Sequence, residues 1–232
     1  FEFIYFSRPD SKIFGSNVDK IRRKLGKVLA QNHPVTDPDD QKVIVISVPD
    51  SSNTAAIGYQ NQLLKQGINS KLEIGLIRSH YIGRTFIQPE QYKRELGVRI
   101  KFNTVKGVLE GRTIVLIDDS IVRGTTSRQL VSLIREARPK SIHLRISSPP
   151  ILFPCYYGMD FPSKEELIAN KFNSDIEKMR EFLGVDSLEY LTQDEMLSAM
   201  LDHKREHFCT ACFPGNYPTL IDKSFKKDEH EI

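Results

Sequence analysis

The feature that most constrains the fold is KVIVISVP (residues 42–49), a nearly continuous run of β-branched residues. Such a run is typical of a strand that is buried on both faces, as in a parallel sheet. Further strands are expected at residues 1–6, 72–77, 112–118 and 141–148. Helices are expected at residues 16–31, 53–66 and 125–137, the first with Val18, Ile21, Leu25, Val28 and Leu29 on one face and Ser16 as its cap. This alternation predicts an α/β domain with a mainly parallel, twisted sheet that helices flank and right-handed crossovers connect.

The pattern also divides the chain into regions. Residues 1–150 carry the alternating strands and helices, and within them residues 79–105 are long, basic and only weakly periodic, which favours a functional loop or lid. Residues 151–222 are predicted to be a mainly helical extension that bears the cysteines, with one short strand near 188–191. Residues 223–232 are charged and are predicted to be a disordered tail.

Composition excludes several classes of protein. At 232 residues, 39% hydrophobic and 27% charged, the chain has the balance of a globular domain with a well-buried core. A dispersed net charge of +3 gives no nucleic-acid footprint, and no apolar run approaches the roughly 20 residues that span a bilayer. Three cysteines are too few for a disulfide scaffold, which favours reduced thiols inside the cell. Because the chain opens at Phe1 without Met, we expect a fragment or a processed product.

The stretch VLIDDSIVRGTTS (115–127) carries the strongest chemical signal. Asp118 and Asp119 fall at the carboxyl end of an expected strand, where open parallel sheets bind ligands. Gly124 and the three hydroxyl residues after it fall at a helix N-terminus, which attracts anions. Carboxylates accept from hydroxyls or a hydrated metal, and the glycine turn donates to phosphate, so a ribose 5-phosphate fits both parts. For the three residues DDS alone, a strand followed by a polar capped turn is an equally good interpretation.

The same stretch resembles the phosphoribosylpyrophosphate (PRPP) motif of type I phosphoribosyltransferases. The segments RPDS, VPDSSNTAAIGY, YIGRTFIQP, RISSPPILFPCYYGMD, KEELIAN and HFCTACFPGNYP extend the resemblance over nearly the whole chain, and together they are similar to the glutamine PRPP amidotransferase family. That resemblance implies a type I phosphoribosyltransferase fold with a C-terminal helical extension. It also implies the first committed step of purine synthesis: PRPP and ammonia, derived from glutamine in the full enzyme, give 5-phosphoribosylamine and pyrophosphate. Only the transferase part is covered, so the family's N-terminal glutaminase domain is expected to be absent.

The resemblance assigns roles residue by residue. The residues expected to bind PRPP are Asp50, Ser51, Ser52, Asp118, Asp119, Ser120, Arg123, Gly124, Thr125, Thr126 and Ser127. Of these, Ser51, Asp118 and Asp119 are expected to reach Mg²⁺, and residues 50–52 belong to the loop that meets the pyrophosphate. Arg84, Tyr81 and Lys101 are the expected catalytic residues of a flexible loop at 79–105. The alternatives left open are an ordinary Asp/Ser helix cap at VPDSS and a solvated basic loop at 79–105.

The cysteines form a second signal. The pair Cys209 and Cys212, spaced C-x-x-C, alone leaves a metal site, a redox pair and coincidence open. With Cys155, the resemblance points to the [4Fe-4S] cluster of one branch of the family. Such a cluster needs four thiolates, and we expect the fourth just upstream of Phe1, which leaves an empty site or zinc as alternatives for this chain. His207 is a possible substitute ligand.

The family resemblance also implies binding partners, and two other functions remain as alternatives. Purine nucleotides such as AMP and GMP are expected as feedback inhibitors, a homo-oligomer (dimer or tetramer) is implied, and neither nucleic acid nor membrane is expected as a partner. The cytoplasm is the expected location, with a plastid as the alternative. One rival is a regulatory protein that binds PRPP without transferase activity, and another is a salvage phosphoribosyltransferase. A regulator that binds nucleic acid should show a concentrated basic face, and a salvage enzyme should lack the cysteines and KEELIAN.

Overall fold

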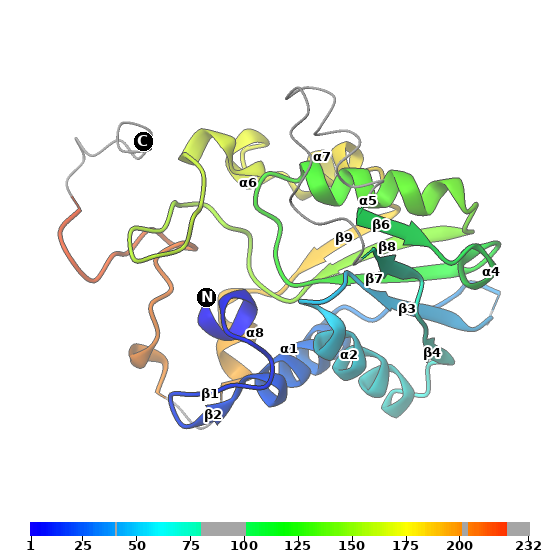
Figure 1. Cartoon of the computed structure of the whole chain (residues 1–232), viewed down its shortest axis with the longest axis horizontal. Coiled ribbons are helices and arrows are strands. Elements are labelled where there is room, and N and C mark those ends of the chain that lie inside the picture. The colour runs from blue at the N-terminus through cyan, green and yellow to red at the C-terminus, as the bar shows by residue number, and fades with distance from the viewer. Residues whose placement is uncertain (40, 80–100, 201–203, 222–232) are drawn as a thin grey trace.

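A five-stranded parallel sheet forms the centre of the computed structural model, which describes residues 1–39, 41–79, 101–200 and 204–221 (Figure 1). The strand order is β4-β3-β7-β8-β9, and every neighbouring pair is parallel. The strands are β3 (Val43–Ser47), β4 (Ser70–Leu72), β7 (Thr113–Asp118), β8 (Ser141–Ile146) and β9 (Ser187–Tyr190). All six residues of β7 are buried, as expected for the middle strand of a sheet that is covered on both sides. The predicted α/β class with a parallel sheet is confirmed.

Helices cover both faces of the sheet because alternate strand residues point to opposite sides. Val43 and Val45 face one core with helices α1 (Val18–Asn32) and α2 (Asn53–Lys65). Ile44 and Ile46 face a second core with α5 (Thr125–Glu136) and α7 (Ile176–Leu183). The two cores pack on the two faces of one sheet, so each strand is held from both sides.

Shorter elements complete the described chain. A hairpin of β1 (Lys12–Ile13) and β2 (Ser16–Asn17) precedes α1, and β5 (Leu76–Arg78) pairs antiparallel with β6 (Phe102–Thr104) beside the main sheet. The remaining helical segments are η1 (Glu2–Phe6), α4 (Lys106–Leu109), η2 (Lys164–Glu166), α6 (Ile168–Lys171), α8 (Gln193–Ser198) and η3 (Arg205–His207). Because β9 pairs with β8, the sheet continues into the extension expected to start at residue 151. Among the described residues, no helix has the length and apolar character needed to cross a membrane.

Three local predictions are wrong. Residues 1–6 form the π-helical turn η1 instead of a strand, because Phe3 and Ile4 are buried in the core while the carbonyls of the turn accept hydrogen bonds from α1. The strand expected at 72–77 is split into β4 and β5, and at Gly75 between them an added Cβ would lie 2.7 Å from Ile46 Cγ2, so the chain passes too close to this β3 side chain for a larger residue. Asn17, and not Ser16, caps α1: its side chain accepts a hydrogen bond from the Lys20 amide.

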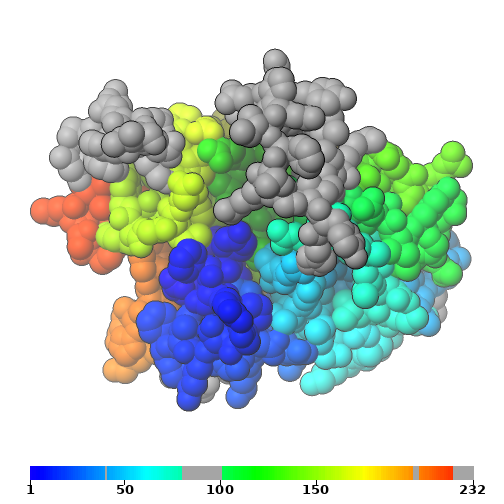
Figure 2. Space-filling view, viewed as in Figure 1, coloured from blue at the N-terminus to red at the C-terminus, as the bar shows by residue number. Residues whose placement is uncertain are grey.

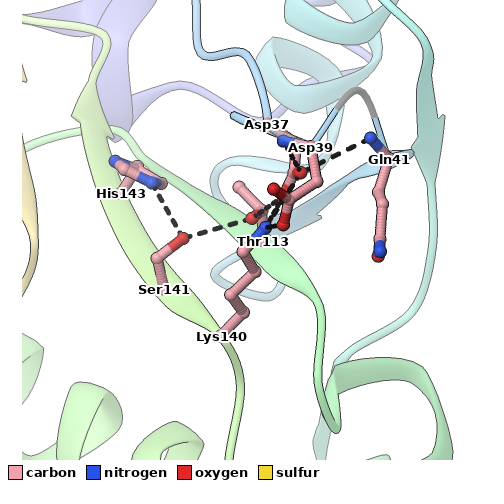
Figure 3. Close-up of polar contacts among 7 residues, drawn as sticks. All are labelled: Asp37, Asp39, Gln41, Thr113, Lys140, Ser141 and His143. Carbon is pink, nitrogen blue, oxygen red and sulfur yellow. Dashed lines mark hydrogen bonds and ion pairs between the residues drawn. The ribbon is translucent and has the colours of Figure 1, made fainter.

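A polar network closes the edge of the sheet where β7 and β8 begin (Figure 3). Thr113 Oγ1 donates to the buried carboxylate of Asp37, which also accepts from Lys140 Nζ at 2.9 and 3.0 Å. Lys140 reaches Asp39 as well, at 2.6 Å, and Ser141 Oγ links Thr113 to the ring of His143. The hydrogen bonds from Thr113 and Lys140 hold the pKa of Asp37 well below its ordinary value. The network thereby ties the loop after α1 to the first residues of two central strands.

Candidate active site

The two loops singled out in the sequence meet at the opposite edge, where β3 and β7 end. The amide of Val48 donates to the carbonyl of Ile117 at 2.9 Å, which holds the strand ends together. Ser52 Oγ lies 3.2 Å from Asp118 Oδ1 and 3.4 Å from Asp119 Oδ1, so one hydroxyl from the first loop bridges both carboxylates of the second. Ser51 Oγ lies 3.3 Å from Ser52 Oγ. The residues predicted to bind Mg²⁺ and the ribose are thus neighbours in space.

The two carboxylates are buried and close together. Asp118 is 8% exposed and Asp119 5%, and the amide of Asp119 donates to Asp118 Oδ1 at 2.9 Å. Burial raises the pKa of Asp118 well above its ordinary value, and the neighbouring charge of Asp119 raises it further. Burial also raises the pKa of Asp119, against the opposing effects of the hydroxyls of Ser120 and Ser51 and the guanidinium of Arg22. Two acidic groups held at such a cost form a place where a cation or hydroxyl donors would be bound favourably.

The helix that follows offers groups of the opposite sign. Gly124 is the N-cap of α5 with φ +77°, a left-handed conformation that suits glycine, and within the part of the chain that the structure describes no side chain caps the helix. The first-turn amides of Thr125, Thr126 and Ser127 therefore face outward at the positive end of a twelve-residue helix. A cavity of about 600 Å³ is lined by residues 118–120 and 123–127 and also by the aromatic residues Phe1, Tyr5 and Phe6. It holds space for a phosphate beside the helix and a sugar beside the carboxylates.

Other predicted residues lie differently. Arg123 borders the cavity, but its Nε donates to Glu166 Oε2 at 2.7 Å, so the guanidinium is held by the KEELIAN segment. Asp50 accepts from Arg78 Nη1 at 3.2 Å and lines a second cavity, about 760 Å³, beside α2 and β5. Lys101 is exposed, and its carbonyl accepts from the Ser79 amide at 2.8 Å. Tyr81 and Arg84 lie outside the described residues, so their catalytic roles stay predictions.

The three cysteines border one small cavity. Cys155, Cys209 and Cys212 line about 120 Å³ together with Phe1 and Tyr217. Burial raises the pKa of Cys212 to about 12, and the other two thiols add to the effect while the N-terminal amine opposes it. In the described part of the chain, no three His, Cys, Asp or Glu side chains are placed to hold a single metal ion. His207, the possible substitute ligand, lines a different, neighbouring cavity.

Sequence reasoning missed the groups that surround the acidic pair. Arg22 is 3% exposed in the middle of α1, and its charge influences Asp119. The hydroxyl of Tyr190, at the end of β9, is buried without a hydrogen-bond partner among the described residues and lies within electrostatic range of Asp118. A signal for Arg22 was present, because an arginine four residues after Val18 and three before Leu25 lies on the apolar face of the helix and interrupts it. Tyr190 left no comparable signal, since a tyrosine at a strand end is common.

Comparison with known proteins places this site in a family. No family model matches the chain. It is 50% identical over 218 residues to the chloroplastic amidophosphoribosyltransferase of Vigna aconitifolia and 48% identical over 223 residues to the amidophosphoribosyltransferase of Bacillus subtilis (strain 168). These matches cover 94% and 95% of this chain but 42% and 44% of the relatives, so the chain spans about two fifths of the length of the curated relatives it matches.

Solved structures agree with the sequence matches. An allosteric regulatory enzyme of purine biosynthesis matches with a TM-score of 0.82 and 47% identity, over 96% of this chain and 46% of that one. Glutamine PRPP amidotransferase from B. subtilis, complexed with ADP and GMP, matches with a TM-score of 0.81 and 48% identity, over 96% and 47% of the two chains. The predicted type I phosphoribosyltransferase fold is confirmed by these superpositions. The chain belongs to the amidophosphoribosyltransferase family and corresponds to the transferase part of its members.

Proposed function

We propose that this chain transfers the ribose 5-phosphate group of PRPP to ammonia, forming 5-phosphoribosylamine and pyrophosphate in purine biosynthesis. The observation that carries the proposal is the junction of the two strand ends, where Ser52 bridges Asp118 and Asp119 while the uncapped N-terminus of α5 opens on the same cavity. An acceptor pair for hydroxyls beside a donor array for phosphate matches a ribose 5-phosphate. Membership of the amidophosphoribosyltransferase family supports this reaction over other uses of the same sugar phosphate.

The chemistry requires little beyond positioning. The bond between C1 of the ribose and the pyrophosphate oxygen breaks, its electron pair leaves with pyrophosphate, and the lone pair of ammonia forms the new C–N bond with loss of a proton. Asp118 and Asp119 would orient the ribose through its hydroxyls, and the amides of residues 125–127 would hold the 5-phosphate. With both ends of the sugar phosphate fixed, C1 is presented in one orientation to the nucleophile.

Magnesium fits the residues present. Asp118, Asp119 and Ser51 supply hard oxygen ligands, and burial raises the pKa of each carboxyl, which supports a bound cation as the group that balances their charge. When bound, Mg²⁺ would neutralise charge on the leaving pyrophosphate. We propose these three residues as its protein ligands.

We also propose an iron–sulfur cluster at the three thiols. Each cysteine of such a cluster binds a different iron, so its ligands are spread around a cavity and need not converge on one point as the ligands of a single ion do. Cys155, Cys209 and Cys212 around one cavity are consistent with that arrangement. Iron and acid-labile sulfide, measured on protein purified without oxygen, test the proposal; zinc in place of iron would contradict it.

Purine nucleotides are proposed inhibitors at the ribose phosphate site. They carry the ribose 5-phosphate that the cavity fits, and a solved relative is complexed with ADP and GMP. Competition of GMP with PRPP in the steady state tests the idea, and inhibition that excess PRPP does not relieve would contradict it. Assembly as a homo-oligomer and a cytoplasmic location stay predictions.

Pyrophosphate release from PRPP with Mg²⁺ and ammonium chloride tests the main proposal. Asp118→Asn and Asp119→Asn should each lose the ammonia-dependent release, whereas Asp39→Asn, a matched change of an exposed aspartate, should keep it. PRPP binding without release in the wild-type chain would favour the regulatory rival. The absence of binding would refute the site.

Stability separates lost chemistry from lost folding. A carboxyl whose pKa is raised in the folded state stabilises the protein below its unfolded pKa and loses that contribution as pH rises through the folded pKa. At neutral pH the buried Asp118 carboxylate therefore destabilises the folded state. Asp118→Asn removes that charge, so the variant should unfold at a temperature at least as high as that of the wild type. Loss of activity together with a lower unfolding temperature would point to damage to the fold instead.

A further inference from the structure

We propose that Arg22 is a positioning residue that holds the N-terminal turn η1 in place as the aromatic wall of the substrate cavity, and that this wall limits the hydrolysis of PRPP. The inference rests on the proposed function, because it concerns how the nucleophile of that reaction is selected. Nothing in the sequence motifs assigned to PRPP, Mg²⁺ or the cysteines includes Arg22.

The hydrogen bonds of the Arg22 side chain all go to backbone carbonyls in and just after η1. Its side chain rises from the middle of α1, and its Nε donates to the carbonyl of Phe3 at 2.9 Å. Its Nη2 donates to the carbonyls of Tyr5 and Ser7 at 2.9 and 2.8 Å. Carbonyls at the end of a helical turn lack partners within the turn and carry partial negative charge. A planar guanidinium with several fixed donors can satisfy three of them at once, which a lysine cannot do with the same geometry.

The turn that Arg22 holds has two different faces. Phe3 and Ile4 are buried in the core beside α1. Phe1, Tyr5 and Phe6 line the same 600 Å³ cavity as the acidic pair and the N-terminus of α5. Tyr5 and Phe6 are 51% and 61% exposed, unusually open for large aromatic residues, as expected of side chains that a bound substrate would cover. In Figure 2 the N-terminal residues form the blue surface between the yellow-green segment that follows β8 and the cyan residues around α2.

The aromatic wall continues beyond η1, from Phe1 to Phe161. The ring of Phe1 meets the edge of Phe161 with centroids 5.0 Å apart, and Phe161 also lines the cavity. Arg22 itself lies within electrostatic range of Asp19 on its own helix and of Asp119 at the end of β7. The guanidinium thus contacts the turn that carries the aromatic wall and lies within electrostatic range of Asp119. Its loss would loosen the wall without removing any residue proposed to touch PRPP or Mg²⁺.

The consequence concerns the competition between ammonia and water. In amination, ammonia attacks C1, the bond to pyrophosphate breaks, and one proton is released. In hydrolysis, water attacks the same carbon, pyrophosphate leaves with the same electron pair, and the products are ribose 5-phosphate, pyrophosphate and a proton. An apolar wall in the cavity that holds the reacting carbon would disfavour the more abundant nucleophile, water, as closed active sites do. A displaced wall should therefore raise hydrolysis relative to amination.

The first experiment measures that partition. Phosphoribosylamine and ribose 5-phosphate are quantified from the same reaction, with PRPP, Mg²⁺ and ammonium chloride, for the wild type, Arg22→Met, Arg22→Lys and Phe6→Ala. The ratio of amination to hydrolysis should fall about tenfold in Arg22→Met and in Phe6→Ala, and less in Arg22→Lys, which keeps the charge and one donor group. Arg23→Met is the matched control. Arg23 is the next residue along α1 and pairs with Asp19 at the surface, so its replacement should leave the ratio unchanged.

A second measurement does not depend on turnover. Hydrogen exchange should become faster in residues 2–8 of Arg22→Met, while β3, β7 and α5 keep their protection. If the wild type released no pyrophosphate with ammonia, the proposed function would fail, and this exchange pattern would still decide the role of Arg22. Unchanged exchange in residues 2–8, or an unchanged product ratio in Phe6→Ala and in a folded Arg22→Met, would overturn the inference.

Discussion

Replacing Gly124 by alanine tests the geometry of the phosphate side of the site. Gly124 has φ +77°, a region that a residue with a Cβ rarely adopts. A Cβ built on it would lie 2.4 Å from Cδ1 of Ile168, a side chain that is 1% exposed and has little space to move. The substitution therefore carries two separate costs, one in the backbone and one in packing.

The two costs can be estimated. A non-glycine residue in the left-handed region costs about 1–2 kcal/mol, and forcing an extra methyl group into a packed core costs about 1–3 kcal/mol. We expect a total near 3 kcal/mol, which for a chain of this size lowers the unfolding temperature by roughly 6–12 °C. The shifted amides of α5 should also weaken PRPP binding, because the 5-phosphate would meet donors in altered positions.

Urea unfolding followed by circular dichroism measures each part. Gly67→Ala is the backbone control, since Gly67 has φ +78° and nothing within 4 Å of its Cβ position, so it should lose only about 1–2 kcal/mol. Ile168→Val removes Cδ1; combined with Gly124→Ala, it should recover about 1–2 kcal/mol relative to the sum of the single changes. A Gly124→Ala protein no less stable than Gly67→Ala, or a double variant without coupling, would refute this reasoning.

Three further outcomes follow from other parts of the structure. Gly58→Ala should destabilise the fold by more than Gly67→Ala, because its Cβ would lie 2.0 Å from a backbone oxygen of α1; urea unfolding of both variants decides this. Asp37→Asn should lower the unfolding temperature at pH 7, and the difference should start to shrink below about pH 4. A lowered pKa stabilises the fold fully above the unfolded pKa of about 3.9, and this stabilisation is lost as pH falls toward the folded pKa. Thermal scans against pH would contradict the prediction if the difference stayed constant in strong acid. In metal-free protein at pH 8, iodoacetamide should modify exposed Cys209 before Cys212, because the pKa of Cys212 is raised to about 12. Mass spectrometry of the peptides measures the order, and earlier modification of Cys212 would contradict the prediction.

The sequence predicted the elements of the sheet well because their patterns depend on burial. The strands at 42–49, 112–118 and 141–148 and the helix at 125–137 are each found within two or three residues of the expected bounds. Residues 1–6 were misassigned because aromatic and β-branched residues favour a strand locally, whereas the hydrogen bonds from Arg22, 15 to 19 positions away in sequence, favour a turn. No local pattern carries that information.

The candidate site was predictable to the same extent and for a similar reason. The resemblance assigned Ser52 and Asp118 to one PRPP site, and the structure brings them together because β3 and β7 are parallel neighbours whose carboxyl ends meet. The pairing of Arg123 with Glu166 could not be predicted, because it joins segments 43 residues apart through two exposed side chains. Residues 80–100, which hold two of the three predicted catalytic residues, lie outside the described chain.

The two ends of strand β7 show how the fold separates stability from function. At its first residue, Thr113 donates to Asp37, whose carboxylate is paired with Lys140 and whose pKa is lowered, so that acid group stabilises the folded state at neutral pH. At its last residue, Asp118 lies beside Asp119 with a raised pKa, so that acid group costs stability at neutral pH. The same strand could have ended in residues that satisfy one another, as it begins. Near this carboxyl pair lie the left-handed Gly124 and the buried hydroxyl of Tyr190, for which the described residues offer no hydrogen-bond partner. A carboxyl pair kept at a cost in such surroundings is what a site requires if its charges are to be balanced by a ligand.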